Sequence, residues 1–125
     1  MINRVAFTMY PVTDMAAARA FYEGTLGLTT NASATTPWVE YDLPGGGCFA
    51  ITTVLSDQPS GSAGGTIAFE VEDIEALTAS LRDAGVRLGS KELIRGPHCR
   101  MMPCFDPDGN SILLHQLDTP TSSGQ

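Results

Sequence analysis

Few side chains in this chain of 125 residues are suited to chemistry, and they lie far apart in the sequence. Glu40 lies in a short run of alternating polar and apolar residues, and His115 lies near the end of another. Each is therefore a candidate general base. The alternatives are an exposed carboxylate at the rim of a sheet and a solvated or structural histidine at a strand end. His98, between Pro97 and Cys99 in an expected loop, is no better a candidate.

The three cysteines, Cys48, Cys99 and Cys104, form an odd set, which indicates free thiols in a reducing cytoplasm. The spacing of Cys99 and Cys104 is not that of a zinc knuckle, and the third cysteine lies far upstream. Neighbouring side chains of a strand point apart, so His98 is poorly placed to activate Cys99 as a nucleophile. We expect Cys48 and Cys104 to be small core residues.

The composition argues against several classes of partner. Fourteen acidic residues against seven Lys and Arg give a net charge of -7. Nucleic acids and anionic membrane surfaces both attract clustered cations, which this chain lacks. No apolar run reaches the roughly 20 residues of a membrane span, and the N-terminus does not have the pattern of a signal peptide. We therefore expect a cytoplasmic protein without nucleic acid or membrane as a partner.

The elements that must position these side chains follow one order twice. The apolar pattern predicts a single domain over 1–117, with modules at 1–55 and 65–117, a linker at 56–64 and a flexible tail at 118–125. Asp14 and Asp73 suit helix N-caps, and Gly85 suits a left-handed C-cap. The expected strands are Val5 to Tyr10, Leu28 to Ser33, Trp38 to Asp42, Cys48 to Thr53, Thr66 to Val71, Val86 to Ile94, Arg100 to Phe105 and Ser111 to Gln116.

Short motifs repeat together with the elements. Val12 to Asp14 matches Val71 to Asp73 at an offset of 59 residues, and Leu43 to Gly47 matches Asp106 to Asn110 at an offset of 63. The fold class expected is α+β, with two tandem βαβββ modules that form a curved mixed sheet around a cleft and carry their helices on the outside.

The two hairpin turns predict which residues lie opposite one another. Asp106 to Gly109 suits a type I turn that ends in a left-handed glycine. Gly45 to Gly47 lacks the Lys and Ser or Thr of a phosphate loop and opens no helix, so it is also interpreted as a hairpin turn. The predicted pairs are Pro103 with Leu113, Met101 with His115, Glu40 with Ala50 and Trp38 with Thr52.

These motifs carry a resemblance to a known family. Val12 to Asp14, Phe21-Tyr22, Leu26-Gly27 and Phe105 to Asn110 resemble, in order and spacing, the vicinal oxygen chelate superfamily. That superfamily includes glyoxalase I, extradiol dioxygenases, fosfomycin-resistance enzymes and bleomycin-resistance proteins. The resemblance implies a homodimer, which sheet edges left unpaired in a lone subunit also favour.

The resemblance also implies where a divalent metal would be held. Its ligands are His or Glu side chains at positions that are here Phe7, Ala50, Thr66 and Leu113. None of the four offers a carboxylate, an imidazole or a thiolate. We therefore expect no metal and no other cofactor.

Strand alternation then predicts the wall of the cleft. Its residues are Phe7, Met9, Trp38, Glu40, Ala50, Thr52, Thr66, Ala68, Met101, Pro103, Leu113 and His115. A largely apolar wall of this kind suits a small organic molecule, with Glu40 as the polar anchor. The alternatives are a metal-free lyase or isomerase that uses Glu40 or His115 as a general base, and a non-catalytic structural or regulatory domain.

Overall fold

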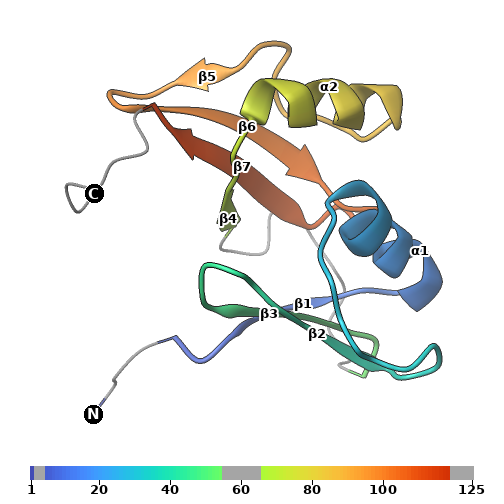
Figure 1. Ribbon diagram of the computed structural model, residues 1–125. Coiled ribbons are helices and arrows are strands. Elements are labelled where there is room, and N and C mark those ends of the chain that lie inside the picture. Colours follow the sequence, from blue (N-terminus) through green and yellow to red (C-terminus); the bar gives the residue numbers. More distant parts are fainter. Residues whose placement is uncertain (2–4, 55–65, 119–125) are drawn as a thin grey trace. The chain divides into compact units, whose positions relative to one another are not determined.

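Two mixed sheets form the core of the part of the chain that the structure, a computed structural model, describes: residues 1, 5–54 and 66–118 (Figure 1). The chain divides into two units, Met1–Ala63 with Pro107–Asn110, and Gly64–Asp106 with Ser111–Gln125. The predicted linker at 56–64 lies outside the described residues, as does the predicted tail beyond residue 118. None of the helices in the described residues has the length and apolar character of a membrane span.

The first unit contains a three-stranded sheet of order β1-β3-β2. Its elements are β1 (Thr8–Pro11), α1 (Met15–Arg19), the π-helix η1 (Ala20–Thr25), β2 (Trp38–Asp42) and β3 (Cys48–Thr52). β1 is parallel to β3, and β2 is antiparallel to it. The carboxylate of Asp14 accepts a hydrogen bond from the Ala17 amide at 3.1 Å, which confirms the predicted N-cap.

The second unit contains a four-stranded sheet of order β4-β7-β6-β5. Its elements are β4 (Ile67–Glu70), α2 (Ile74–Asp83), β5 (Ile94–Arg95), β6 (Cys99–Phe105) and β7 (Ser111–Leu117). Asp73 caps α2, and Gly85 follows it with a left-handed φ of +75°, both as predicted. In each unit the first strand pairs in parallel with the last strand. The α+β class is therefore confirmed, and both units share the order strand, helix, strands, although the described first unit has three strands where the predicted βαβββ module has four.

An aromatic cluster fills the core of the first unit. Tyr22, Tyr41 and Phe49 are fully buried. The ring of Phe49 lies 5.1 Å from that of Tyr22, 6.3 Å from that of Tyr41 and 5.3 Å from that of Tyr10. Tyr22 comes from η1, so the helix buries its aromatic face on one side of the sheet. The opposite side of the sheet carries no member of this cluster, although Ala50 and Thr52 on that side are also fully buried.

The predicted strand Leu28 to Ser33 is wrong, because these residues form no strand. The guanidinium of Arg19 donates to the Ser33 carbonyl at 2.6 Å and to the Ala32 carbonyl at 3.4 Å. The Thr30 hydroxyl donates to the Glu40 carbonyl at 2.7 Å and accepts from the Ala32 amide. Side chains thus bind the backbone groups that a strand ladder would use.

The predicted strand Val86 to Ile94 is also largely wrong. Only an isolated bridge from Leu88 to Cys104 and the two residues of β5 pair with β6. Pro103 of β6 has no amide hydrogen to donate at this edge, and its carbonyl accepts from the Gly89 amide at 2.8 Å. A side chain at Gly89 would clash with Pro103, since its Cβ would lie 2.8 Å from the Pro103 Cβ. A proline and a close backbone approach therefore interrupt the ladder.

The turn between β6 and β7 belongs to the first unit, although its flanking strands belong to the second. The Asp108 carboxylate accepts hydrogen bonds from the hydroxyl of Thr13 at 2.5 Å and from its amide at 3.2 Å. The Asn110 side-chain amide donates to the Pro11 carbonyl at 2.9 Å. The turn thus binds the backbone between β1 and α1.

Thiol reagents should modify Cys104 at least about tenfold more slowly in the folded protein than in urea. Cys104 is fully buried, and burial raises the pKa of its thiol from 9.0 to about 12, with the negative charge of Asp106 adding to the effect. A raised pKa leaves little thiolate at pH 8, which slows attack on the reagent. Mass spectrometry after timed labelling measures this rate for each cysteine, and equal rates in the two conditions would contradict the prediction.

Candidate functional site

The predicted hairpin registers are confirmed, and they place the predicted residues of the first module on one side of its sheet. Trp38 lies opposite Thr52, and Glu40 opposite Ala50. Met9 of β1 also pairs with Ala50. The Phe7 ring meets the Trp38 ring edge-on at 5.8 Å. Since the aromatic core lies on the other side, this side carries Phe7, Met9, Trp38, Glu40, Ala50 and Thr52.

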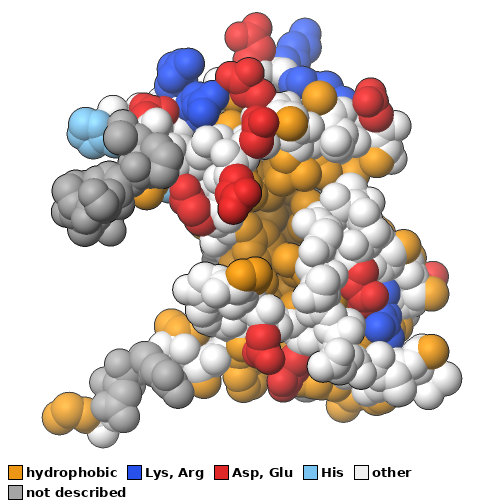
Figure 2. All heavy atoms as spheres, in the orientation of Figure 1, with side chains coloured by type: hydrophobic (Ala, Val, Ile, Leu, Met, Phe, Trp, Pro, Cys, Tyr) orange, Lys and Arg blue, Asp and Glu red, His pale blue; other side chains and the backbone are white. Residues whose placement is uncertain are grey.

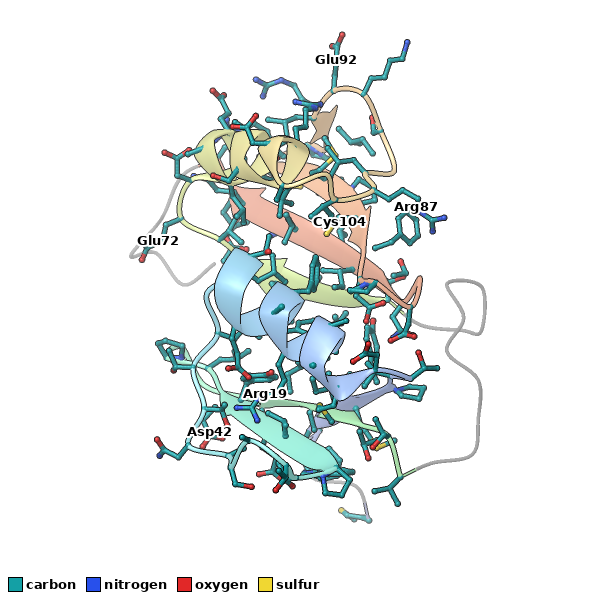
Figure 3. The ribbon with its side chains drawn as sticks, turned by 90° about the vertical axis from the view of Figure 1, so that its right-hand side faces the viewer. Arg19, Asp42, Glu72, Arg87, Glu92 and Cys104 are labelled. Carbon is teal, nitrogen blue, oxygen red and sulfur yellow. The ribbon has the colours of Figure 1, made fainter. Side chains whose placement is uncertain are left out.

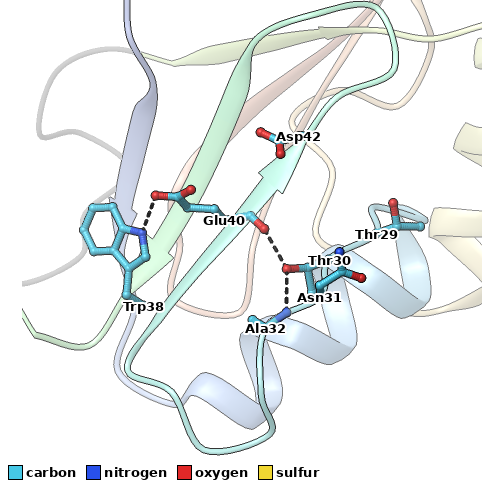
Figure 4. Close-up of a pocket in the computed structure, with 7 residues that line it drawn as sticks. All are labelled: Thr29, Thr30, Asn31, Ala32, Trp38, Glu40 and Asp42. Atoms are coloured by element: carbon cyan, nitrogen blue, oxygen red, sulfur yellow. Dashed lines mark hydrogen bonds between the residues drawn. The ribbon is translucent and has the colours of Figure 1, made fainter.

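Glu40 has a partner that the sequence did not indicate. The indole nitrogen Nε1 of Trp38 donates to Glu40 Oε2 at 2.9 Å (Figure 4). Glu40 is exposed, so solvent also reaches its carboxylate. The predicted polar anchor therefore has a hydrogen-bond partner within the protein. The indole hydrogen bond orients the carboxylate but leaves its negative charge uncompensated.

A pocket of about 450 Å³ lies beside this carboxylate (Figure 4). Its lining consists of Thr29, Thr30, Asn31, Ala32, Trp38, Glu40 and Asp42. Sequence reasoning missed the first four because it assigned them to a strand. It also missed Asp42, although Asp42 shares the alternation of Trp38 and Glu40 along β2, and this signal could have identified it.

A network of charged and polar groups holds the 29–32 wall of the pocket. Arg19 binds the Ala32 and Ser33 carbonyls, and its Nε donates to Glu23 Oε2 at 2.7 Å. The Tyr41 hydroxyl donates to the same oxygen of Glu23 at 2.9 Å. Burial, and then the hydrogen bond and charge of Glu23, raise the pKa of Tyr41 well above its ordinary value of 10.0. The carboxylate of Glu23 thus connects Arg19, which binds the 29–32 wall, to Tyr41 of β2.

The negative charges on β2 also affect the neighbouring thiol of β3. Burial raises the pKa of the Cys48 thiol above 9.0, and the charges of Glu40 and Asp42 raise it further. Cys48 pairs with Asp42 in the sheet. This side of the first sheet therefore combines an aromatic pair with a negative field.

The registers of the second sheet are confirmed too. Leu113 pairs with Ala68 and Pro103, and His115 pairs with Met101 and Glu70. The hydroxyl groups of Thr66 and Ser111 lie 2.7 Å apart. The predicted residues Thr66, Ala68, Met101, Pro103, Leu113 and His115 therefore share one side of this sheet. The single cleft predicted for both modules stays a prediction.

His115 is held by a carboxylate on the neighbouring strand. Its Nδ1 lies 2.6 Å from Glu70 Oε1, and the other oxygen of Glu70 accepts from the Leu117 amide at 2.9 Å. With the proton on Nδ1, the basic lone pair of the imidazole is on Nε2. His98, by contrast, is exposed, and its carbonyl accepts from the Asp118 amide. Of the two histidines, His115 thus has the arrangement of an oriented base.

The residues present do not fit a divalent metal. Phe7 packs on Trp38, and Thr66 bonds to Ser111, so neither is arranged as a ligand. Ala50 and Leu113 offer no donor atom. Within residues 1, 5–54 and 66–118, no three His, Cys, Asp or Glu side chains are grouped so that they could hold a metal ion.

Comparison with known proteins places this arrangement in context. The family model described as Glyoxalase/Bleomycin resistance protein/Dioxygenase superfamily matches residues 2–114. Among solved structures, TnmS3, an antibiotic binding protein from Streptomyces sp. CB03234, is 28% identical with a TM-score of 0.74, over 93% of this chain and 97% of that one. A glyoxalase/bleomycin resistance protein from the same organism is 27% identical with a TM-score of 0.71, over 88% of this chain and 97% of that one.

A more distant structure shares the fold alone. FosX, a fosfomycin resistance protein from Listeria monocytogenes, is 18% identical with a TM-score of 0.72, over 93% of this chain and 94% of that one. A comparison with curated proteins finds no match.

Proposed function

The chain belongs to the Glyoxalase/Bleomycin resistance protein/Dioxygenase superfamily, and we propose that it binds a small organic molecule in a largely apolar cleft without a metal ion. The observation that carries the proposal is the aromatic pair Phe7 and Trp38 beside the carboxylate of Glu40. Phe7 is 45% exposed and so gives a ligand ring a surface to pack on.

The similar structures support this class of function. TnmS3 is described as an antibiotic binding protein, and its 28% identity extends over nearly the full length of both chains. The metal-free part of the proposal is supported by the side chains at the family's ligand positions, Phe7, Ala50, Thr66 and Leu113, which lack suitable donors. A homodimer and a cytoplasmic location belong to the same proposal. The three cysteines are free, which agrees with a reducing compartment.

Bleomycin and daunorubicin, two antibiotics with planar ring systems, should quench the fluorescence of the protein in a saturable way. Trp38 is the only tryptophan of the chain and lines the proposed site, so its emission reports on this surface. Calorimetry should give the same affinity in buffer and in excess EDTA, because no metal is part of the site. Elemental analysis of the purified protein should find no stoichiometric Zn, Mn, Fe or Ni.

The Phe7→Ala variant tests the assignment to this surface. It removes the ring that packs on Trp38 and should weaken the binding of whichever antibiotic the wild type binds. Absence of saturable binding for both antibiotics would contradict the proposed function. Stoichiometric metal that survives dialysis would contradict the metal-free part alone.

A second function, a metal-free lyase or isomerase, is favoured by the Glu70–His115 pair at 2.6 Å. Glu70 would hold the Nδ1 proton and so keep Nε2 basic for proton abstraction. This observation favours His115 over Glu40 as the base, since Glu40 accepts a hydrogen bond from the neighbouring indole. If this second function is correct, a His115→Asn variant should lose the turnover of a candidate substrate and retain daunorubicin binding. A protein that only binds would turn over no candidate substrate, even as the wild type.

A further inference from the structure

The pocket beside β2 differs in chemistry from the apolar wall predicted for the cleft. Hydroxyl and amide side chains of Thr29 and Asn31 line one part of it, and the carboxylates of Glu40 and Asp42 line another. A volume of about 450 Å³ is within the range of small-molecule sites. Figure 4 shows the side chains of Glu40 and Asp42 on β2 and those of Thr29 to Ala32 on the facing segment.

None of the seven residues that line the pocket is cationic. The Glu40 carboxylate accepts from an indole N–H, which is a neutral donor. The residue paired with Asp42 in the sheet, Cys48, has a raised pKa and so brings a neutral thiol. Neutral donors orient a carboxylate without cancelling its charge. A neutral ligand that covered these two groups would have to remove water from two uncompensated negative charges, which is costly.

The net negative charge of the first unit also favours a cationic ligand over a neutral one. Its described residues carry five carboxylate side chains against the single guanidinium of Arg19, which is already paired with Glu23. The carboxylates are Asp14, Glu23, Glu40, Asp42 and Asp108. In Figure 2, most of the visible Lys and Arg side chains lie on the unit that carries α2, and Asp and Glu side chains appear on both units.

We propose that this pocket is a subsite for the ammonium group of an organic ligand, with Glu40 and Asp42 as its counter-charges and Trp38 as an adjoining aromatic surface. The subsite rests on the proposed small-molecule binding and adds the chemical class of the ligand. An ammonium group carries donors for both carboxylates and for the Thr29 hydroxyl oxygen. It also interacts favourably with the face of an indole.

The test uses two probes that share one ring system. Daunorubicin carries a protonated amine on its sugar, and N-acetyldaunorubicin carries a neutral amide at the same atom. Calorimetry on the full chain should show that the cationic probe binds about tenfold more tightly, since charge-assisted hydrogen bonds exceed neutral ones. Added salt should reduce this preference, because the carboxylates are exposed.

Variants locate the effect. Glu40→Gln keeps an oxygen acceptor for the Trp38 indole, and Asp42→Asn keeps the size of the side chain. Each should reduce the preference for the cationic probe by about threefold, in the range of a partly exposed ion pair, and the double variant should abolish it. Glu92→Gln is the matched control, because it removes one negative charge from an exposed residue of the second unit (Figure 3) and should leave the preference unchanged.

The outcomes separate the two proposals. Equal affinity for the two probes would overturn the ammonium subsite and leave the proposed function standing. A preference that persists in the double variant would overturn the assignment to Glu40 and Asp42. If neither probe binds, the subsite fails together with the proposed function on which it rests.

Discussion

Replacing Phe49 by alanine should lower the free energy of unfolding by about 3–5 kcal/mol, the usual cost of deleting a buried aromatic ring. Phe49 is fully buried and contacts the rings of Tyr10, Tyr22 and Tyr41. The cavity left by its ring would be surrounded by large, rigid side chains that cannot collapse into it. Because domains of this size are stable by only about 5–15 kcal/mol, much of the folded population should be lost at moderate urea.

Phe7→Ala is the matched control, since it deletes the same ring from the opposite side of the same sheet. Phe7 is 45% exposed, and its loss should cost less than about 1 kcal/mol. Urea titrations followed by circular dichroism give both values. Equal losses for the two variants would show that the Phe7 side of the sheet is as tightly packed as the aromatic core, which would contradict its proposed role as a binding surface.

Removing the carboxylate of Glu23 should cost about 1–3 kcal/mol, because the fully buried Tyr41 would lose the acceptor of its hydroxyl group. Arg19 would lose its ion pair in the same variant, Glu23→Ala. Tyr41→Phe should cost less, since it removes the donor and leaves the Arg19–Glu23 pair intact. Losses of equal size in the two variants would show that the hydrogen bond to Tyr41 is the only contribution of Glu23.

The same network predicts a sensitivity to alkali. The folded-state pKa of Tyr41 is raised above its ordinary value of 10.0 by burial and by Glu23. The folded state therefore keeps the Tyr41 proton above pH 10, where the unfolded chain loses it. The contribution of this group to the free energy of unfolding is fully present below pH 10 and is lost as the pH rises through the folded-state pKa. Urea titrations of wild type and Tyr41→Phe measure this difference. A difference between the two that stays constant from pH 8 to pH 11 would contradict the prediction.

Local signals were sufficient for the registers and the helix starts. The turns at Gly45 to Gly47 and at Asp106 to Gly109 contain glycines that accept the left-handed φ of a tight hairpin, so the pairing of Glu40 with Ala50 and of Met101 with His115 followed directly. Asp14 and Asp73 act within one helical turn of their own position. Such short-range chemistry is present in the sequence itself.

The error at Leu28 to Ser33 arose where a distant side chain competed for the backbone. Nothing in Leu28 to Ser33 indicates that Arg19, from the preceding helix, takes the Ala32 and Ser33 carbonyls. The same contact holds the wall of the pocket, so the wrongly predicted strand and the missed pocket residues 29–32 have one cause. The bond from the Trp38 indole to Glu40 was missed for a related reason, because strand alternation places two side chains on one face without telling whether they touch.

The turn Pro107–Asn110 has a consequence for how the chain can be divided. A gene fragment encoding residues 1–55 would still contain each strand and helix described for the first unit. The Thr13 amide and hydroxyl and the Pro11 carbonyl would nevertheless lose their partners on Asp108 and Asn110. The two copies of the motif are therefore not interchangeable building blocks. The first copy is completed by residues that follow β6 of the second copy, so the bonds that join the β1–α1 connection to this turn can form only after Asn110 has been synthesised.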